Sequence, residues 1–459
     1  MSDAALAAAP VAVAPSHVVP SHGELARRIL ALAAPTTMVA ALQSACQLVE
    51  PFLAARQGTA SLAGWAVVLP FALLLQQMST GAMGGGVVSA IARALGARKP
   101  QEASSLVMHA VVIALCFALG YVVLLALVPR SLFALIAGRE TAEAAAAYAA
   151  WLFGAGAIPA WLANTLASVL RGGGRHALAS RILVLAWLVY PGLAWLLMEP
   201  LGQGLPGMGM AFAIVMWGAA AAMAAVVLRG GAGFVPELRV RLSGALFGRI
   251  LSVGLIACVL ATVANLTTIL VTARVAAYGT AAVAAYGVSA RMEFLIVPLA
   301  FGVGSALTAL VGQAVGGRDW ATARRIAWTG AAMAFVICAT MGLFTALLPE
   351  TVARAFSGDP EVVAIASQAL AIIGWALPGF GVGMALYFAS LGAARMRWPV
   401  MAGLSRILVA VGGGWVLADL LGFGLQGQFV AVALGITAYG AFTAASVRPG
   451  VWPGGTGRG

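Results

Sequence analysis

One acidic residue, Glu50, lies inside a long apolar stretch near the start of the chain. An acid in such surroundings is costly unless it has a partner, a hydrated cavity or a proton. On a helix with 3.6 residues per turn, three other polar side chains would lie within about 60° of it. They are Thr36, Gln43 and Gln47. Pro51 has no amide hydrogen, so the Gln47 carbonyl would lose its helical donor and could ligate a cation or a water. The pattern predicts a carboxyl group that exchanges a proton or Na⁺, and the alternative is an ion pair with Arg56.

The second half of the chain has a comparable polar stripe without an acid. Asn265, Thr268 and Thr272 would share one face of a helix. Farther along, Arg291 and Glu293 interrupt an apolar run, but residues two apart on a helix do not face each other. Each is therefore expected to have a partner on another helix, either in a structural ion pair or with a role in substrate binding or gating.

Further polar residues within apolar runs are candidates for the wall of a substrate cavity, although a packing role also fits each of them. They are Thr36, Gln76, Asn164, Asn265, Thr268 and Tyr387, together with Arg291 and Glu293 if these two bind substrate. The four cysteines show no CxxC or Cys/His spacing, so neither a metal site nor a disulfide is predicted. We find no nucleophile motif, Gly-rich phosphate loop or cluster of titratable groups, so we expect neither an enzyme nor a cofactor.

Membrane-spanning helices must position these residues. Of the 459 residues, 62% are hydrophobic and only 9% are charged, whereas soluble proteins contain about 25% charged residues. The apolar runs are about 20 residues long, rich in Ala and Leu, and lack the alternation of a β-barrel. The net charge of +12 does not indicate nucleic-acid binding, because the basic residues are spread between the apolar runs.

Charged or Gly/Pro-rich breaks divide the chain into twelve apolar runs, which predicts an all-α integral membrane protein with twelve transmembrane helices. The predicted spans are 28–54, 62–90, 105–128, 144–170, 179–198, 208–228, 249–277, 282–313, 327–348, 364–392, 399–419 and 425–446.

The basic residues predict the orientation of these spans. With the N-terminus inside, the cytoplasmic segments hold 20 of the 26 Lys and Arg residues and the outer segments hold four. The other two, Arg274 and Arg291, fall within spans. The positive-inside rule therefore predicts that both termini are cytoplasmic. The bias toward Arg, Ala and Gly suggests a GC-rich bacterial genome, so we expect a multi-pass protein of the bacterial cytoplasmic (inner) membrane.

The two halves of the chain match each other. At a shift of 221 residues, QGTASLAGWAV (57–67) aligns with YGTAAVAAYGV (278–288), and at a shift of 220 Gly96 aligns with Gly316. Each half has six predicted helices, an even number, so the halves are expected to be two parallel six-helix repeats with substrate sites at their interface.

This division sets the expected domain boundaries. They are a disordered cytoplasmic tail over 1–22, an N-terminal bundle over 23–228, a cytoplasmic linker over 229–248, a C-terminal bundle over 249–447 and a cytoplasmic tail over 448–459.

Several strings along the chain resemble, in order, those of the multidrug and toxic compound extrusion (MATE) exporters. LVEPFLAARQGTASLAG (48–64) is similar to their first-helix pattern, SVLRGGGRHAL (168–178) to the exit of helix 4, and ALVGQAVGGRDWATARR (309–325) to the connection between helices 8 and 9. The resemblance covers nearly the whole chain and implies a MATE-like fold. The sequence departs from the family at Glu50, where bacterial members usually carry Asp, and at Leu188–Pro191, where polar Asn and Asp are missing.

The resemblance implies a secondary antiporter that couples H⁺ or Na⁺ entry to export of amphipathic, cationic organic compounds by alternating access. Glu50, with Gln47 and Gln43, is the expected coupling site for H⁺ or Na⁺, and no other metal ion is expected. We expect a small-molecule substrate, a monomer in the lipid bilayer and no nucleic-acid partner. An alternative is a flippase for lipid-linked or polyanionic substrates, in which Arg274 and Arg291 would matter more. A membrane-embedded enzyme is the third alternative.

Overall fold

The computed structural model describes residues 20–127 and 129–453, and no β-strand occurs within them. The helices of the first half are α1 (His22–Arg56), α2 (Thr59–Gln76), α3 (Met83–Gly96), α4 (Pro100–Val122), α5 (Pro129–Ala149), α6 (Ala157–Gly172), α7 (His176–Met198) and α8 (Gly204–Leu228). Those of the second half are α9 (Gly244–Val275), α10 (Thr280–Gly316), α11 (Trp320–Leu347), α12 (Pro349–Phe356), α13 (Pro360–Ile373), α14 (Leu377–Gly392), α15 (Arg397–Ile407) and α16 (Gly424–Ser446). Short π- or 3₁₀-helical segments extend or interrupt them at η2 (Gln77–Ala82), η3 (Val123–Leu127), η4 (Ala150–Ala155), η5 (Ala276–Tyr278), η6 (Gly374–Ala376), η7 (Leu408–Gly413) and η8 (Val416–Leu420).

The predicted all-α membrane fold is confirmed. Among the described residues, eleven helices are long and apolar enough to cross a membrane, and each overlaps one predicted span. The remaining span, 144–170, corresponds to a pair of helices, Thr141–Ala155 and Ala157–Gly172, that is bent by 44°. The bend falls at η4, where a π-helical segment changes the helical register. Counting this pair as one span gives twelve.

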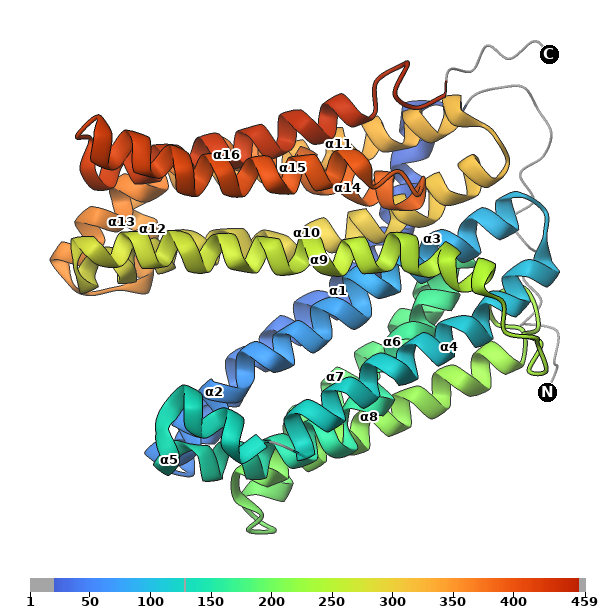
Figure 1. Ribbon diagram of the computed structural model, residues 1–459, viewed down its shortest axis with the longest axis horizontal. Helices are drawn as coiled ribbons and strands as arrows, with labels where there is room; N and C mark the ends of the chain where they lie inside the picture. The colour runs from blue at the N-terminus through green and yellow to red at the C-terminus, as the bar shows by residue number, and fades with distance from the viewer. Residues whose placement is uncertain (1–19, 128, 454–459) are drawn as a thin grey trace.

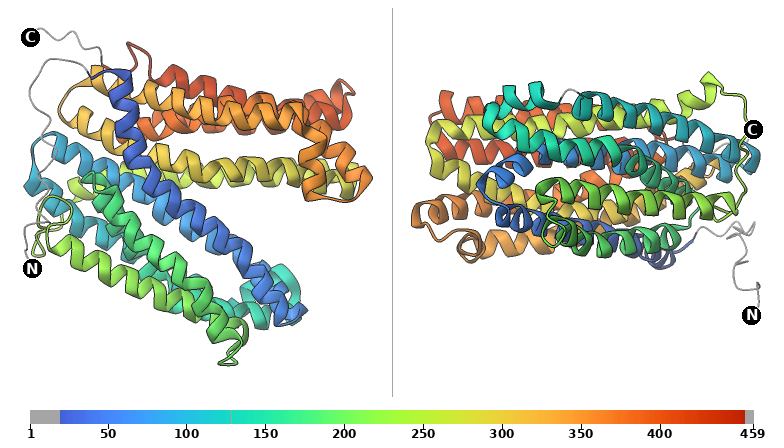
Figure 2. Two further views of the ribbon diagram at one scale, coloured as in Figure 1. Left: turned by 180° about the vertical axis from the view of Figure 1, so that it is seen from behind. Right: turned by 90° about the horizontal axis from the view of Figure 1, so that it is seen from below.

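The helices form two groups that converge at one end and diverge at the other (Figures 1 and 2). In Figure 1 the lower group holds α2–α8 and the upper group holds α9–α16. The connection between α8 and α9 lies at the converging end, whereas α5 and α12 lie at the diverging end. The chain therefore has a V shape.

Helix α1 runs from one group into the other. Leu25 and Ala33, near its start, share an apolar core with residues of α10 and α11. Val39 and later residues of α1 pack in the first-half core, and Pro35 lies between the two sets. Helix α9 does the reverse, because Ile250 near its start packs in the first-half core. This exchange of helix ends joins the two halves at the converging end.

Two glycines allow α3 and α10 to approach closely at this end. A Cβ atom at Gly96 would collide with the backbone of Gln313, and one at Gly316 would collide with the backbone of Arg93. The two collisions are equivalent, since 316 − 96 and 313 − 93 both equal 220, the shift of the sequence repeat. The pseudo-two-fold axis between the halves therefore passes between α3 and α10.

Parts of the predicted tails belong to the fold. Ser21 caps the N-terminus of α1, which begins at His22. Trp452 is fully buried, and its ring centroid lies 5.8 Å from that of Trp320. An indole of this size gains free energy by leaving water, which explains why the chain around it packs on the helices. The remainder of the predicted tails, 1–19 and 454–459, lies outside the described residues.

The predicted linker is shorter than expected and is docked on α4. Helix α9 begins at Gly244 rather than at residue 249. The Glu237 amide donates to Ser104 Oγ at 2.7 Å, and the Ser243 amide donates to His109 Nε2 at 2.9 Å. These bonds satisfy backbone groups that a loop would otherwise leave to water.

Candidate functional site

Glu50 lies on α1 and is held by two aromatic side chains from neighbouring helices. The Tyr190 hydroxyl on α7 donates to Oε1 at 2.9 Å, and the Trp65 indole on α2 donates to Oε2 at 3.1 Å. Both aromatic residues are buried, whereas Glu50 is half-buried. Tyr190 stands in the stretch of the predicted fifth span where Asn and Asp are missing, so a phenol supplies the polar group there. A tyrosine at this position of an apolar run was a usable signal in the sequence, but it was not among the predicted site residues.

A small cavity lies beside Glu50. Gln43 and Gln47 of α1 and Gln76 of α2 contribute to its polar wall, and aromatic residues of α5, α7 and α8 line much of the rest. Its volume is about 40 Å³. One water needs about 10–15 Å³, so roughly three waters would fill the cavity. Pockets for drug-sized ligands start at about 300 Å³. In this conformation the cavity has room for a small hydrated ion, but not for an organic substrate.

Arg56, the base that the sequence offered as a partner for Glu50, is engaged elsewhere. Its Nη2 donates to Glu199 Oε2 at 2.9 Å and joins the ends of α1 and α7. The second half has an equivalent pair, Arg274 with Asp419, at 2.7 Å, and 419 − 199 equals 220. Among the described residues, Glu50 has no ion pair, so nearby donors alone stabilise its charge.

The π-helical segment η2 connects this cavity with the second half. Gln76, which lines the cavity, accepts a hydrogen bond from Asn164 Nδ2 at 3.0 Å, and Asn164 also donates to Ser79 Oγ at 2.9 Å. The next residue, Gln77, accepts a hydrogen bond from Asn265 of α9 at 3.0 Å. Three of the predicted cavity residues, Gln76, Asn164 and Asn265, are thus brought together around η2. π-Helical turns are frequent at functional sites.

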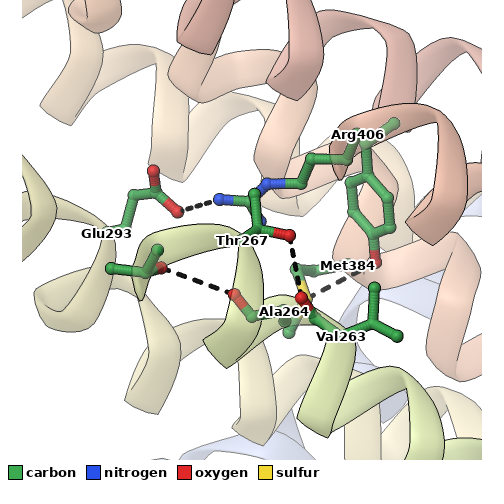
Figure 3. A network of polar contacts seen from close by, with 8 residues as sticks. Val263, Ala264, Thr267, Glu293, Met384 and Arg406 are labelled. Carbon is green, nitrogen blue, oxygen red and sulfur yellow. Dashed lines mark hydrogen bonds and ion pairs between the residues drawn. The ribbon is translucent and has the colours of Figure 1, made fainter. Parts of the chain in front are cut away.

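The intramembrane charges of the second half are partly neutralised. Figure 3 shows Glu293 of α10 and Arg406 of α15 pointing toward each other, with Thr267 of α9 beside them. Arg406 Nη2 donates to Glu293 Oε2 at 2.6 Å, and both side chains are less than a fifth exposed. The Arg406 guanidinium also lies 5.4 Å from the Phe380 ring centroid. Arg291 is exposed and has no polar partner among the described residues, contrary to the expectation that it would pair with another helix.

Three other predicted residues lie outside the Glu50 cavity. Thr36 is fully buried and hydrogen-bonds to His176 of α7 at 3.2 Å. It shares a helix face with Glu50 but lies roughly 20 Å away along the axis, at 1.5 Å per residue. Thr268 donates to a carbonyl of its own helix at 3.4 Å. Tyr387 packs against Phe388, with ring centroids 5.1 Å apart. Thr36 is therefore not in the Glu50 cavity, although both residues lie on the same face of α1, because they are far apart along the helix axis.

A second polar cluster, which the sequence patterns did not predict, lies near the converging end. Arg171, at the end of α6, is 1% exposed and lies 5.8 Å from the ring centroid of Phe301. Its Nε is buried without a hydrogen bond, as are Nε2 of His176 and Oγ of Ser180. Removing a guanidinium from water costs several kcal/mol, and a cation–π contact returns about 2 kcal/mol. The contact with Phe301 alone does not compensate the charge. The positive-inside count places Arg171 among the cytoplasmic residues, so charge distribution gives no reason to single it out.

These features define a polytopic helical membrane transporter, with two repeated halves and a lone carboxyl group in a small internal cavity. The model of the MatE family matches residues 35–196 and 254–416, and the chain belongs to this family. The matched segments begin 219 residues apart (254 − 35) and end 220 apart (416 − 196), so each falls on one half of the repeat. The chain is a transporter and not an enzyme.

The comparisons with individual proteins agree with this assignment. The probable multidrug resistance protein NorM of Rhodopseudomonas palustris is 29% identical over an alignment that covers 90% of this chain and 89% of NorM. The Vibrio cholerae MATE transporter VcmN in the bent form superposes with a TM-score of 0.86 at 19% identity, covering 93% of this chain and 97% of VcmN. A MOP superfamily transporter from Pyrococcus furiosus gives a TM-score of 0.84 at 21% identity, covering 94% and 98% of the two chains.

Proposed function

We propose that this protein is an H⁺- or Na⁺-coupled antiporter that exports amphipathic organic compounds by alternating access, with Glu50 as the coupling residue. The observation that carries the proposal is the environment of Glu50. Its carboxyl group lies inside a span, has no basic partner among the described residues and borders a cavity the size of a few waters. Such a group can hold a proton or a small cation and release it when the cavity opens.

The neighbours of Glu50 suit both states of the carboxyl group. The Tyr190 hydroxyl and the Trp65 indole donate to the ionised form, and the phenol oxygen can also accept from the protonated form. The amides of Gln43 and Gln47 each offer a donor and an acceptor at the cavity wall. A Na⁺ ion would use the carboxylate and these amide oxygens, whereas a proton would need the carboxylate alone.

Polar residues at the junction of α2 and η2 connect the Glu50 cavity to the second half. Gln76 faces the cavity, and Gln77 bonds Asn265 across the interface between the halves. Filling or emptying the cavity would shift α2 and η2 and so strengthen or break the bond between Gln77 and Asn265. The substrate would bind between the halves, since the cavity itself is too small for it.

The alternative of a flippase for lipid-linked or polyanionic substrates has less support. It depends on Arg274 and Arg291 as binding groups. Arg274 is neutralised by Asp419 and also donates to Gln428 at 3.0 Å. Arg291 has no partner among the described residues and provides a single exposed charge. Two such residues do not form the basic cavity that a polyanion would need.

We place the protein in the bacterial cytoplasmic membrane as a monomer with both termini and the α8–α9 linker in the cytoplasm. The distribution of basic residues supports this orientation, at 19 to 4 once Arg406, which pairs with Glu293 inside a span, is left out of the cytoplasmic count. With it, the V opens to the outside. Cysteine labelling in intact cells tests the orientation. Leu242→Cys in the linker should resist an impermeant thiol reagent, whereas Gly358→Cys, where a side chain meets no atom within 4 Å, should react. Labelling of Leu242→Cys alone would reverse the orientation.

The decisive experiment compares Glu50→Gln with wild type in liposomes that carry a lipophilic cationic dye, under a pH gradient or a sodium gradient. The amide keeps the shape and removes the exchangeable charge. We expect gradient-driven dye transport to fall at least about tenfold, equivalent to roughly 1.4 kcal/mol on the barrier. Glu50→Asp should keep partial activity. Glu199→Gln is the matched control, because it neutralises an acid that is engaged with Arg56. Wild-type transport by Glu50→Gln at equal protein content would remove Glu50 from the mechanism.

A further inference from the structure

The cluster of Arg171, His176 and Ser180 has polar capacity that the fold does not use. Arg171 and His176 flank the turn between α6 and α7, and Ser180 lies one helical turn after His176 on the same face of α7. All three are at most 2% exposed. Arg171 Nε is buried without a hydrogen bond, and Arg171 forms no ion pair within the described residues. His176 Nε2 and Ser180 Oγ also lack partners. Buried groups of this kind require an explanation, such as a ligand.

The repeat shows that the fold does not need polar side chains at the positions of Arg171 and His176. Near the equivalent turn of the second half, Gly392 corresponds to Gly172 at the shift of 220. At that shift, Arg171 corresponds to Leu391 and His176 to Met396. Leu391 is fully buried and Met396 is 4% exposed. At these two positions the second half therefore has apolar side chains, whereas the first half has a cation and an imidazole. Apolar residues at such positions are often at least as stabilising as buried charges.

The cluster lies where the two halves meet. The Arg171 guanidinium faces Phe301 of α10, and Thr36, which bonds His176, belongs to the part of α1 that crosses between the halves. A ligand could reach Arg171 only when α6 and α10 separate at the converging end. Glu50 lies toward the diverging end. Along α1 it is roughly 20 Å from Thr36, the residue that contacts this cluster.

We propose that Arg171, His176 and Ser180 form a binding site for the anionic group of an organic molecule, a carboxylate or a phosphate, that enters from the converging end. The guanidinium supplies the charge and a planar pair of donors, the type of group that binds these anions in a bidentate manner. The Ser180 hydroxyl supplies a further donor, and the N-terminus of α7 adds a favourable dipole. The transported compounds would then include anions or zwitterions. This inference extends the proposed export function, but its test measures binding and does not depend on ion coupling.

The test uses benzoate as the probe and the purified full-length protein, with thermal unfolding followed as a function of probe concentration. Benzylammonium carries the same ring with the opposite charge, and phosphate serves as a bare inorganic anion. We expect benzoate to raise the unfolding temperature of the wild type. Arg171→Leu, which installs the residue of the equivalent turn, should remain folded and weaken benzoate binding at least about tenfold, with benzylammonium unaffected. His176→Met should weaken benzoate binding less.

Two control variants establish whether benzoate binds at this cluster. Arg229→Leu removes an exposed arginine at the end of α8 and should leave benzoate binding unchanged. Glu199→Gln, at the other end of α7, should also bind benzoate normally. Benzoate binding needs no ion gradient, so a failure of the coupling proposal would not be mistaken for a failure here. Normal benzoate binding by Arg171→Leu, or no benzoate binding by the wild type, would refute the proposal. Failure of Arg171→Leu to fold would make the charge structural and refute it as well. Equal stabilisation by phosphate would assign the site to an inorganic ion instead.

Discussion

A 2.9 Å hydrogen bond joins the Tyr190 hydroxyl on α7 to the Glu50 carboxyl group on α1. The two helices are also joined at their ends by the pair between Arg56 and Glu199. Because the phenol donates to a carboxylate and can accept from a carboxylic acid, the bond changes its direction or strength when Glu50 gains a proton. Under the proposed mechanism, the packing of α1 against α7 therefore depends on whether Glu50 carries a proton.

Tyr190→Phe tests this coupling. The change removes one donor to a charged group, an interaction typically worth about 1.5–3 kcal/mol, so gradient-driven dye transport should fall roughly tenfold. The same change in a Glu50→Gln background should have little further effect, because the two residues act as one unit. Tyr148→Phe is the control, since Tyr148 lines the same cavity while Tyr190 and Trp65 are the described donors to Glu50. Additive losses in the double variant would show that Tyr190 acts independently of Glu50.

The bond between Gln77 and Asn265 provides a second prediction. These side chains link η2 to α9 across the two halves at 3.0 Å. If transport requires the bond to break, a short thiol cross-linker between cysteines at both positions should stop dye transport, and a cleavable linker should restore it on reduction. The native Cys46, Cys116 and Cys258, together with Cys338, must first be replaced. Undiminished transport by the fully cross-linked protein would show that η2 and α9 stay together throughout the cycle.

Sequence patterns predicted the fold because the signals extend over whole helices. Runs of about 20 apolar residues predict membrane-spanning helices. An even number of spans in each half places the two repeats in the same orientation. The glycines at 96 and 316 were visible as aligned residues, and the structure adds the reason, which is the close approach of α3 and α10. The fourth span was predicted as one continuous segment, whereas η4 bends it, and apolar composition carries no signal for a bend.

The site could be predicted only in part. Glu50, Gln43 and Gln47 lie within two turns of one another, so helical periodicity was enough to group them. Thr36 lies on the same face of the helix but farther along its axis. Helical periodicity identifies the face and does not show whether distant residues share a cavity. Contacts between distant segments, such as Trp65 with Glu50 or Arg406 with Glu293, depend on how helices pack. A single sequence contains no local pattern for them.

The symmetric contact between α3 and α10 provides a third prediction, on stability. Gly96→Ala and Gly316→Ala each place a methyl group against backbone atoms of the other half, and backbone cannot move aside as a flexible side chain can. Overpacking of this kind costs about 1–3 kcal/mol, so each variant should unfold at a lower temperature than wild type. Gly120→Ala and Gly192→Ala are matched controls, since a Cβ there meets nothing within 4 Å, and a methyl in a helix is favourable. Equal unfolding temperatures for both sets of variants would show that α3 and α10 can move apart at the converging end without loss of stability.

The pair formed by Glu293 and Arg406 allows a structural role to be separated from a transport role. Removing one partner leaves a buried charge unpaired, which costs about 3–5 kcal/mol, so Glu293→Gln and Arg406→Met should each lower the unfolding temperature strongly. The double variant Glu293→Leu with Arg406→Met replaces the pair by apolar groups and should recover most of the stability. Because Glu293 is already neutralised at 2.6 Å and lies in the half opposite to Glu50, we expect the double variant to retain dye transport within about threefold of wild type. The measurement is transport per folded protein in liposomes, with thermal unfolding of the same preparations. A stable double variant that has lost transport would instead make this pair part of the transport mechanism and give the second half a charge-dependent step of its own.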